Sequence, residues 1–252
     1  MGTYAAVVLA GGAARRMGGV DKPALPVGGR PMRDRVLAAV SDATPRVLVG
    51  AADAAPAGVR LVREDPPGGG PVAAAAAGLA LLDADITVVA LLAADLPLLT
   101  RAAIGDLLEH LDRETPDTEP PGGGSAPAPP AHSGLHPAPP GCSGPDGERR
   151  PDGERRPDGE RRPDGERRPD GACFVDGDGR RQSLCGVWRV AALRAAVDRL
   201  TVERGGSLSG APVRALLAGL VVREVAWSGE GPPPWFDCDT DEDVRRAEEW
   251  TR

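Results

Sequence analysis

The chain has 252 residues, of which 41% are hydrophobic, so it is long enough to bury a substantial core. Its formal net charge of −7 argues against a protein that binds nucleic acid through broad electrostatic attraction. No apolar run approaches the about 20 residues of a membrane span, and the N-terminus lacks the features of a secretion signal, so we expect a soluble, cytoplasmic protein that binds neither nucleic acid nor membrane.

The first half of the chain alternates strands and helices. Near-continuous runs of Val, Leu, Ala and Ile predict strands that are buried on both faces, as in a parallel sheet. These strands are expected at Tyr4–Ala10, Arg46–Gly50, Val59–Val62 and Ile86–Ala93. Helices are expected between them, at Arg33–Val40, Val72–Leu82 and Arg101–Leu111. The alternation predicts an α/β fold in which helices cover both faces of a mostly parallel sheet.

A segment rich in Pro, Gly and Arg interrupts this pattern. From Pro145 to Arg168 the hexapeptide Pro-Asp-Gly-Glu-Arg-Arg is repeated four times, and it contains no large apolar residue to bury. We expect residues 113–170 to be a disordered insert that separates two parts of one domain, residues 1–112 and 171–252. A charged docking arm is the alternative, but each copy of the repeat is charge-neutral.

Secondary structure is expected again from Ala172 onward. A β-hairpin and one further strand are predicted at Cys173–Asp176, Gln182–Arg189 and Val221–Trp227. Helices are predicted at Val190–Leu200, Arg214–Leu220 and Asp241–Trp250. The last helix begins with a capping pair, Thr240 and Asp243.

A glycine-rich loop from Leu9 to Lys22 follows the first strand and carries the strongest chemical signal. Glycines let backbone N–H groups approach phosphates closely, and Arg16 and Lys22 supply the positive charge that a triphosphate requires. The loop has neither the P-loop pattern nor the dinucleotide-binding pattern, which disfavours a P-loop kinase and a dehydrogenase. An ordinary glycine-rich turn is the alternative, but the two basic residues favour a phosphate site.

Four acidic residues lie where an α/β fold places ligands. Asp95 follows a buried strand, and ligands bind outside the carboxyl ends of such strands. Its carboxylate suits Mg²⁺ bound together with nucleotide phosphates, although it also fits a plain turn. Asp65 precedes a second glycine-rich stretch and is equally well interpreted as a turn residue. Asp237 and Asp239 are expected on one side of a strand before the last helix.

The loop pattern L-A-G-G-x-x-x-R-M-G-G-x-D-K resembles the signature of the molybdenum cofactor guanylyltransferases, which are Rossmann-like nucleotidyltransferases. The resemblance covers residues 4–111 and 172–250 and implies a Rossmann-like three-layer sandwich. It implies that phosphates are bound by Arg16 and Lys22 and that Asp65 contacts the nucleotide. It also implies that the guanine nucleotide touches Leu9, Ala10, Gly11 and Gly12.

The same resemblance assigns the metal. It implies that Asp95 holds Mg²⁺ and that Asp239 completes the site, with Asp237 beside it. The guanylyltransferases commonly carry Asn at both positions of that last pair, so this chain departs from them there. It departs again at Gly50, where these enzymes tend to carry Asn, and the base or ribose contact of that Asn is not expected here.

The activity implied by the resemblance is transfer of GMP from GTP to the molybdopterin (molybdenum) cofactor with release of pyrophosphate. It also suggests transient contact with molybdoenzymes or cofactor-biosynthesis proteins. A CTP-using or sugar-phosphate nucleotidyltransferase on the same fold is the first alternative, but the cytidylyl branch usually reads L-A-A-G, so Gly11 favours guanine. A non-catalytic nucleotide-binding regulatory protein is the second, and such a protein has little use for Lys22, Asp95 and Asp239 together.

Thiol chemistry and a separate metal site are not expected. The four cysteines are scattered without a C-x-x-C pair, which favours reduced thiols. His132 and His136 lie near Cys142 in the predicted insert, a grouping that we interpret as incidental.

Overall fold

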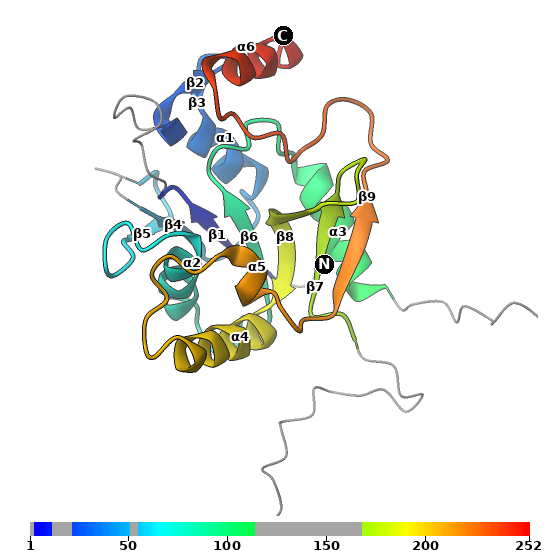
Figure 1. Ribbon diagram of the computed structural model, residues 1–252. Helices are drawn as coiled ribbons and strands as arrows, with labels where there is room; N and C mark the ends of the chain where they lie inside the picture. Colours follow the sequence, from blue (N-terminus) through cyan, green and yellow to red (C-terminus); the bar gives the residue numbers. More distant parts are fainter. Residues whose placement is uncertain (1–2, 12–21, 51–54, 114–167) are drawn as a thin grey trace, which may run out of the picture. The chain divides into compact units, whose positions relative to one another are not determined.

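The computed structural model describes residues 3–11, 22–50, 55–113 and 168–252. These residues form a central sheet of seven strands (Figure 1). In spatial order the strands are β5 (Val59–Val62), β4 (Arg46–Val49), β1 (Ala5–Leu9), β6 (Val88–Ala93), β8 (Arg181–Arg189), β7 (Gly171–Val175) and β9 (Val222–Ala226). All of them run in one direction except β8, which is antiparallel to both of its neighbours.

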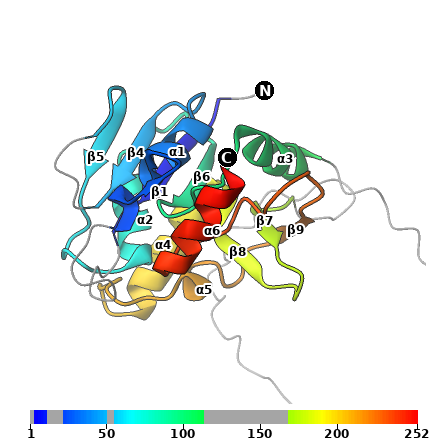
Figure 2. The same ribbon diagram turned by 90° about the horizontal axis from the view of Figure 1, so that it is seen from above.

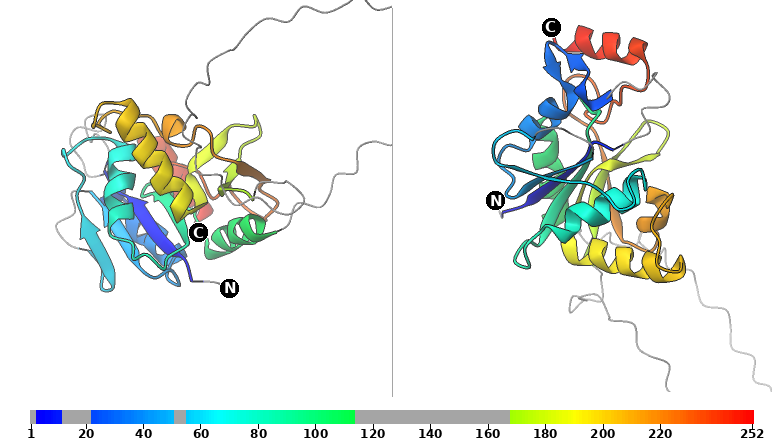
Figure 3. Two further views of the ribbon diagram at one scale, coloured as in Figure 1. Left: turned by 90° about the horizontal axis from the view of Figure 1, so that it is seen from below. Right: turned by 90° about the vertical axis from the view of Figure 1, so that its left-hand side faces the viewer.

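Helices cover both faces of this sheet. One face carries α1 (Met32–Ala39) and α3 (Arg101–Asp112), whereas the other carries α2 (Pro71–Ala80), α4 (Val190–Glu203) and the short α5 (Val213–Leu216) (Figure 2). The view from below shows α4 and α3 on opposite sides of the strands (Figure 3). The predicted α/β fold, a three-layer sandwich with a mostly parallel sheet, is therefore confirmed.

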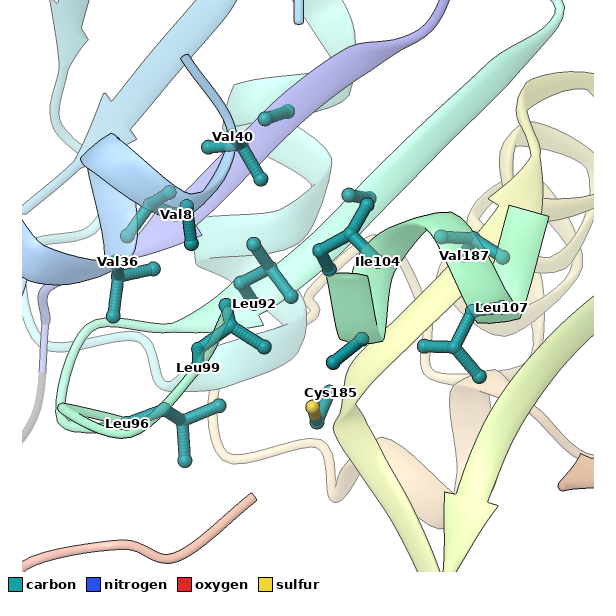
Figure 4. Packing of buried hydrophobic residues seen from close by; sticks show 14 of the residues in the cluster. Val8, Val36, Val40, Leu92, Leu96, Leu99, Ile104, Leu107, Cys185 and Val187 are labelled. Carbon is teal, nitrogen blue, oxygen red and sulfur yellow. The ribbon is translucent and has the colours of Figure 1, made fainter. Parts of the chain in front are cut away.

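The central strands are apolar throughout because helices cover them on both sides. All five residues of β1 are buried, as are the four middle residues of β6. One core cluster lies between the sheet and the α1/α3 face, where Val8, Leu92 and Val187 of three adjacent strands pack with Ile104 and Leu107 of α3 (Figure 4). Burying each of these side chains contributes about 1.5–3 kcal/mol, which holds the carboxyl ends of the strands in place.

A smaller lobe stands beyond the carboxyl edge of the sheet. The 3-10 turn η2 (Lys22–Ala24) leads into a small ribbon of β2 (Pro26–Val27) and β3 (Arg30–Pro31), and the last helix α6 (Asp241–Trp250) lies beside that ribbon (Figures 1 and 3). A separate apolar cluster joins the lobe through Val27, Met32, Leu98, Cys238 and Ala247. The ribbon was not predicted, because its two-residue strands are too short to show a periodic pattern.

The elements predicted within the described residues occur within a few residues of their expected ends, with one exception. Residues 235–239, which precede α6, do not form the predicted strand. Cys238 enters the apolar cluster of the lobe, and its N–H donates to the carbonyl of Asp95 at 3.3 Å without a continuing ladder. Asp237 and Asp239 are nevertheless exposed, and Cys238 between them is buried. Exposed and buried side chains therefore alternate as expected, although no strand forms.

The capping pair predicted before the last helix is confirmed. The Thr240 hydroxyl accepts from the N–H of Asp243 at 3.2 Å, and the Asp243 carboxylate accepts from the N–H of Thr240 at 2.8 Å. The hydrogen bonds from Thr240 lower the pKa of Asp243. Helix α6 therefore begins at a defined residue directly after the acidic segment, which fixes where that segment ends.

The predicted insert lies almost wholly outside the described residues, so its disorder and the single-domain organisation stay predictions. Among the described residues, no helix combines the length and the apolarity that crossing a membrane requires. Cys173, Cys185 and Cys238 are buried and free, in agreement with reduced thiols, whereas His132, His136 and Cys142 are outside the described residues.

Deleting Thr118–Arg168 is expected to leave one cooperative unfolding transition and a nearly unchanged Tm. The flanking segments are tied to the sheet without it, because Arg189 donates to the carbonyl of Pro169 at 3.0 Å and Arg223 to that of Arg113 at 2.8 Å. The entropy of closing a loop also changes only slowly with its length. Thermal unfolding followed by circular dichroism checks this expectation, and a broad, non-cooperative transition in the deleted protein would contradict it.

Candidate functional site

The candidate site lies at the carboxyl edge of the sheet, where β1 and β6 are neighbours. The chain leaves β1 toward β4 on one side, while β6 lies on the other, so the strand order reverses at this point. In open α/β sheets the crevice outside such a reversal is where ligands bind. The loop predicted to bind phosphates follows β1, and Asp95 follows β6, so the topology brings these two predicted features together.

Three residues predicted from separate motifs meet in one contact. The ammonium group of Lys22 donates to Asp95 Oδ2 at 2.6 Å and to Asp239 Oδ1 at 2.6 Å. Asp95 is positioned by its backbone, because the preceding N–H of Ala94 donates to the carbonyl of Leu9 at 3.0 Å. Asp239 is positioned by Cys238, whose N–H donates to the carbonyl of Asp95. The turn that begins at Lys22, the segment after the end of β6 and the segment before α6 therefore meet at one ammonium group.

The contact is partly withdrawn from water. The Lys22 and Asp95 side chains are 20% and 23% exposed, whereas that of Asp239 is 68% exposed. Burial lowers the pKa of Lys22, but the hydrogen bonds and charges of Asp239 and Asp95 outweigh it, so its pKa is raised overall. Lys22 is therefore charged at neutral pH and offsets two carboxylates.

Asp237 lies near this group and interacts with it through charge. The residue is exposed overall, but partial removal of its carboxyl group from water, followed by the negative charge of Asp239, raises its pKa. The charge of Asp95 also raises the pKa of Asp237, whereas that of Lys22 lowers it. The predicted pair of Asp237 and Asp239 is therefore close together, and Asp239 is the member that bonds to Lys22.

The start of the glycine-rich loop is packed against the ends of β4 and β5. The N–H of Ala10 donates to the carbonyl of Val49 at 2.7 Å, and the N–H of Gly50 donates to that of Val62 at 2.9 Å. Gly50 has a φ of +144°, and a Cβ there would stand 2.8 Å from the carbonyl carbon of Ala10. An Asn at position 50 does not fit this backbone, which accounts for the departure noted in the sequence.

Glu64, the neighbour of the predicted Asp65, is the buried acid that follows β5. Glu64 is 6% exposed and its Oε1 accepts from the N–H of Gly68 at 3.0 Å, whereas Asp65 is exposed. A Cβ built on Gly11 would lie 3.3 Å from Glu64 Oε1. The carboxylate that reaches the loop after β1 is thus that of Glu64. No contact among the described residues supports the predicted role of Asp65.

The remaining predicted residues divide into two groups. Leu9 is buried in the core cluster on the α2/α4 face of the sheet, whereas Ala10 is partly buried and packs against the cluster on the α1/α3 face. Gly12 and Arg16 lie outside the described residues, and their predicted contacts stay predictions. No group of three or more His, Cys, Asp or Glu side chains is arranged around a metal position in the part of the chain that the structure describes.

Known proteins are similar to this chain in sequence. The family model of the MobA-like NTP transferase domain matches residues 6–149, which is more than half of the chain. A probable molybdenum cofactor guanylyltransferase from Haloferax mediterranei is 33% identical over 120 residues, which are 44% of this chain and 56% of that relative. The chain therefore matches little more than half the length of this relative.

Solved structures share the fold at low identity. The molybdopterin-guanine dinucleotide biosynthesis protein A from Archaeoglobus fulgidus has a TM-score of 0.57 at 16% identity, with 97% of each chain covered. The 2-C-methyl-D-erythritol 4-phosphate cytidylyltransferase from Thermus thermophilus has a TM-score of 0.55 at 18% identity, with 98% of each chain covered. These likenesses show the nucleotidyltransferase fold, and the match of the family model shows that the chain belongs to the MobA-like NTP transferase domain family.

Proposed function

We propose that this nucleotidyltransferase transfers GMP from GTP to the molybdopterin cofactor, with Mg²⁺ as its metal and pyrophosphate as the second product. The observation that carries the proposal is the contact of Lys22 with Asp95 and Asp239 beside the loop after β1. A phosphate-binding cation and two hard carboxylates then lie at one point of the sheet edge. The name of the Haloferax relative supports guanine and the molybdenum cofactor.

The carboxylates fit a magnesium ion. Asp95 Oδ2 and Asp239 Oδ1 each lie 2.6 Å from one cationic nitrogen, so both oxygens already face a single positive charge. Mg²⁺ is usually bound by one or two carboxylates together with substrate phosphates and water, which agrees with a set of two. Bound there, it would neutralise negative charge on the phosphates. We assign Asp95 and Asp239 as its ligands and place Asp237 nearby as a further acidic group.

In the proposed reaction a phosphate oxygen of the acceptor attacks the α-phosphorus of GTP. A new P–O bond forms, the bond to the β-phosphate bridging oxygen breaks, and pyrophosphate leaves. Lys22 has three N–H donors, of which two point to carboxylates, so one is available to a phosphate oxygen. Arg16 is proposed as a second cation and the backbone of Gly11 and Gly12 as the phosphate cradle. Positioning and charge stabilisation then supply the rate, without a covalent nucleophile.

A CTP-using enzyme is the second candidate, because a cytidylyltransferase shares the fold over nearly its whole length. Gly11 in L-A-G-G favours guanine over cytosine through the resemblance to guanylyltransferases. A regulatory protein without activity is disfavoured, since a nucleotide binder gains little from keeping Lys22, Asp95 and Asp239 in contact. The deciding experiment is to incubate the purified protein with each NTP, Mg²⁺ and molybdopterin and to follow pyrophosphate. Release with CTP and not GTP would contradict the proposal.

Gly11→Ala is expected to lower kcat/KM for GTP by roughly tenfold and to raise the ratio of CTP to GTP turnover. The added methyl would stand 3.3 Å from Glu64 Oε1, closer than atoms usually approach, so it disturbs the loop where the larger purine would lie. Steady-state kinetics with both nucleotides check this. Gly177→Ala is the matched control, because its Cβ meets nothing within 4 Å. Equal losses with GTP and CTP would show that Gly11 serves only the conformation of the loop.

A further inference from the structure

Glu64 is the one charged residue that is buried in the described part of the chain. It follows β5 at the carboxyl edge of the sheet and is 6% exposed. Removing a carboxylate from water costs folding free energy unless hydrogen bonds or an opposite charge replace the water. A buried Glu at this position therefore requires an explanation that packing does not supply.

Only one of the two carboxylate oxygens of Glu64 has a hydrogen-bond partner among the described residues. Oε1 accepts from the N–H of Gly68 at 3.0 Å. Oε2 is also buried, and no described residue donates to it. Buried polar atoms nearly always have partners, so an acceptor without one among the described residues points to a donor beyond them, such as a bound ligand.

The carboxylate faces the proposed nucleotide loop. A Cβ on Gly11 would lie 3.3 Å from Oε1 and 3.7 Å from Oε2, so both oxygens are directed at the first described glycine of that loop. On its other side the carboxylate holds Gly68, in the glycine-rich turn that leads into α2. Neither Gly11 nor Gly68 has a side chain, and a Cβ built on Gly68 would meet no atom within 4 Å.

We propose that Glu64 is a specificity-determining residue that accepts hydrogen bonds from the Watson–Crick edge of guanine. Guanine presents two adjacent donors there, N1–H and the N2 amino group, and the lone pairs of a carboxylate can accept both while Oε1 keeps Gly68. Cytosine and adenine present a ring acceptor beside their amino group, and that acceptor is repelled by the carboxylate. The inference rests on the proposed function. It assigns the selection of guanine to Glu64 in addition to Gly11.

The test compares nucleotides that differ only at the edge that Glu64 reads. Inosine triphosphate lacks the N2 amino group, and xanthosine triphosphate carries an oxygen in its place. By isothermal titration calorimetry the wild type is expected to bind GTP more tightly than either, by roughly tenfold to hundredfold, the value of a hydrogen bond to a charged group. Glu64→Gln is expected to reverse the order of GTP and xanthosine triphosphate, since an amide donates to that oxygen while accepting from N1–H.

Glu249→Gln, an exposed carboxylate of α6, is the matched control and is expected to bind all three nucleotides as the wild type does. An unchanged preference for GTP in Glu64→Gln overturns the assignment. If that variant does not fold, equal affinity of the wild type for GTP and inosine triphosphate overturns it instead. If the wild type releases pyrophosphate from GTP but does not prefer GTP over inosine triphosphate or over xanthosine triphosphate, only the role of Glu64 is contradicted. If the wild type binds no nucleoside triphosphate, the proposed function is contradicted as well.

Discussion

Asp95→Asn is expected to slow nucleotidyl transfer by roughly hundredfold or more while the protein stays folded. The carboxylate follows β6, its side chain is 23% exposed, and its Oδ2 lies 2.6 Å from Lys22 Nζ. The substitution keeps the size of the side chain but removes the charge that a hard cation requires. Because Asp239 remains as a partner for Lys22, the Tm is expected to fall by no more than about 2–4 °C. Pyrophosphate release and thermal unfolding are the two measurements.

Two other carboxylates make this result specific. Asp239 is 68% exposed, and the resemblance to guanylyltransferases places an Asn at its position, so Asp239→Asn is expected to lose much less activity than Asp95→Asn. Asp83, which is 67% exposed and pairs with Arg60 at 3.7 Å, is the control for a surface charge change, and Asp83→Asn is expected to have no effect. Normal turnover of Asp95→Asn with Mg²⁺ would show that the metal has been assigned to the wrong residue.

Lys22→Ala is expected to weaken GTP binding, to slow transfer roughly hundredfold or more and to increase the affinity for a free divalent cation. The first two effects follow because a phosphate loses its cation. The affinity for the divalent cation rises because the ammonium group of Lys22 is hydrogen-bonded to Asp95 and Asp239. Without this group, both carboxylates are available to the cation. Calorimetric titration with GTP, and Mn²⁺ binding to the nucleotide-free protein followed by electron paramagnetic resonance, measure the two affinities separately.

The composition of the chain offers an independent measurement on the same residue. Lys22 is the only lysine among the 30 basic Lys and Arg residues, so an amine-reactive reagent can label just this side chain and the N-terminal amine. GTP is expected to protect Lys22 from labelling, whereas the N-terminal amine serves as the internal control. Unchanged Mn²⁺ affinity in Lys22→Ala, together with equal labelling with and without GTP, would contradict a role of Lys22 at both the phosphates and the metal.

Most of the strands and helices were predictable because local sequence patterns indicate them. The buried runs of β1 and β6 are apolar without interruption, and the caps at Thr100 and Thr240 mark where α3 and α6 begin. The ribbon of β2 and β3 was missed, since two-residue strands have no period. The strand expected at Asp237 and Asp239 was wrong, because polar alternation also describes an extended segment held by one buried side chain, here Cys238.

The chemistry of the site was also predictable in part. Lys22 and Asp95 belong to short motifs in which residue type and spacing indicate phosphate and metal binding. Their contact was not, because Lys22 lies 73 positions from Asp95 and 217 positions from Asp239 along the chain. The order of the strands places the end of β1 beside the end of β6, and the hydrogen bond from Cys238 to Asp95 brings Asp239 to the same edge.

The sequence by itself determined the α/β class, the elements with strong periodicity and the resemblance to guanylyltransferases, and it predicts a phosphate site in the loop after β1. The tertiary structure decided which of two adjacent acids faces the loop, because a one-residue step at the end of β5 points Glu64 inward and leaves Asp65 exposed. The tertiary structure also explains why position 50 requires a glycine, since the close approach of Ala10 leaves no room for a Cβ. Both depend on distances between segments that are remote in the chain, and no local pattern encodes those distances.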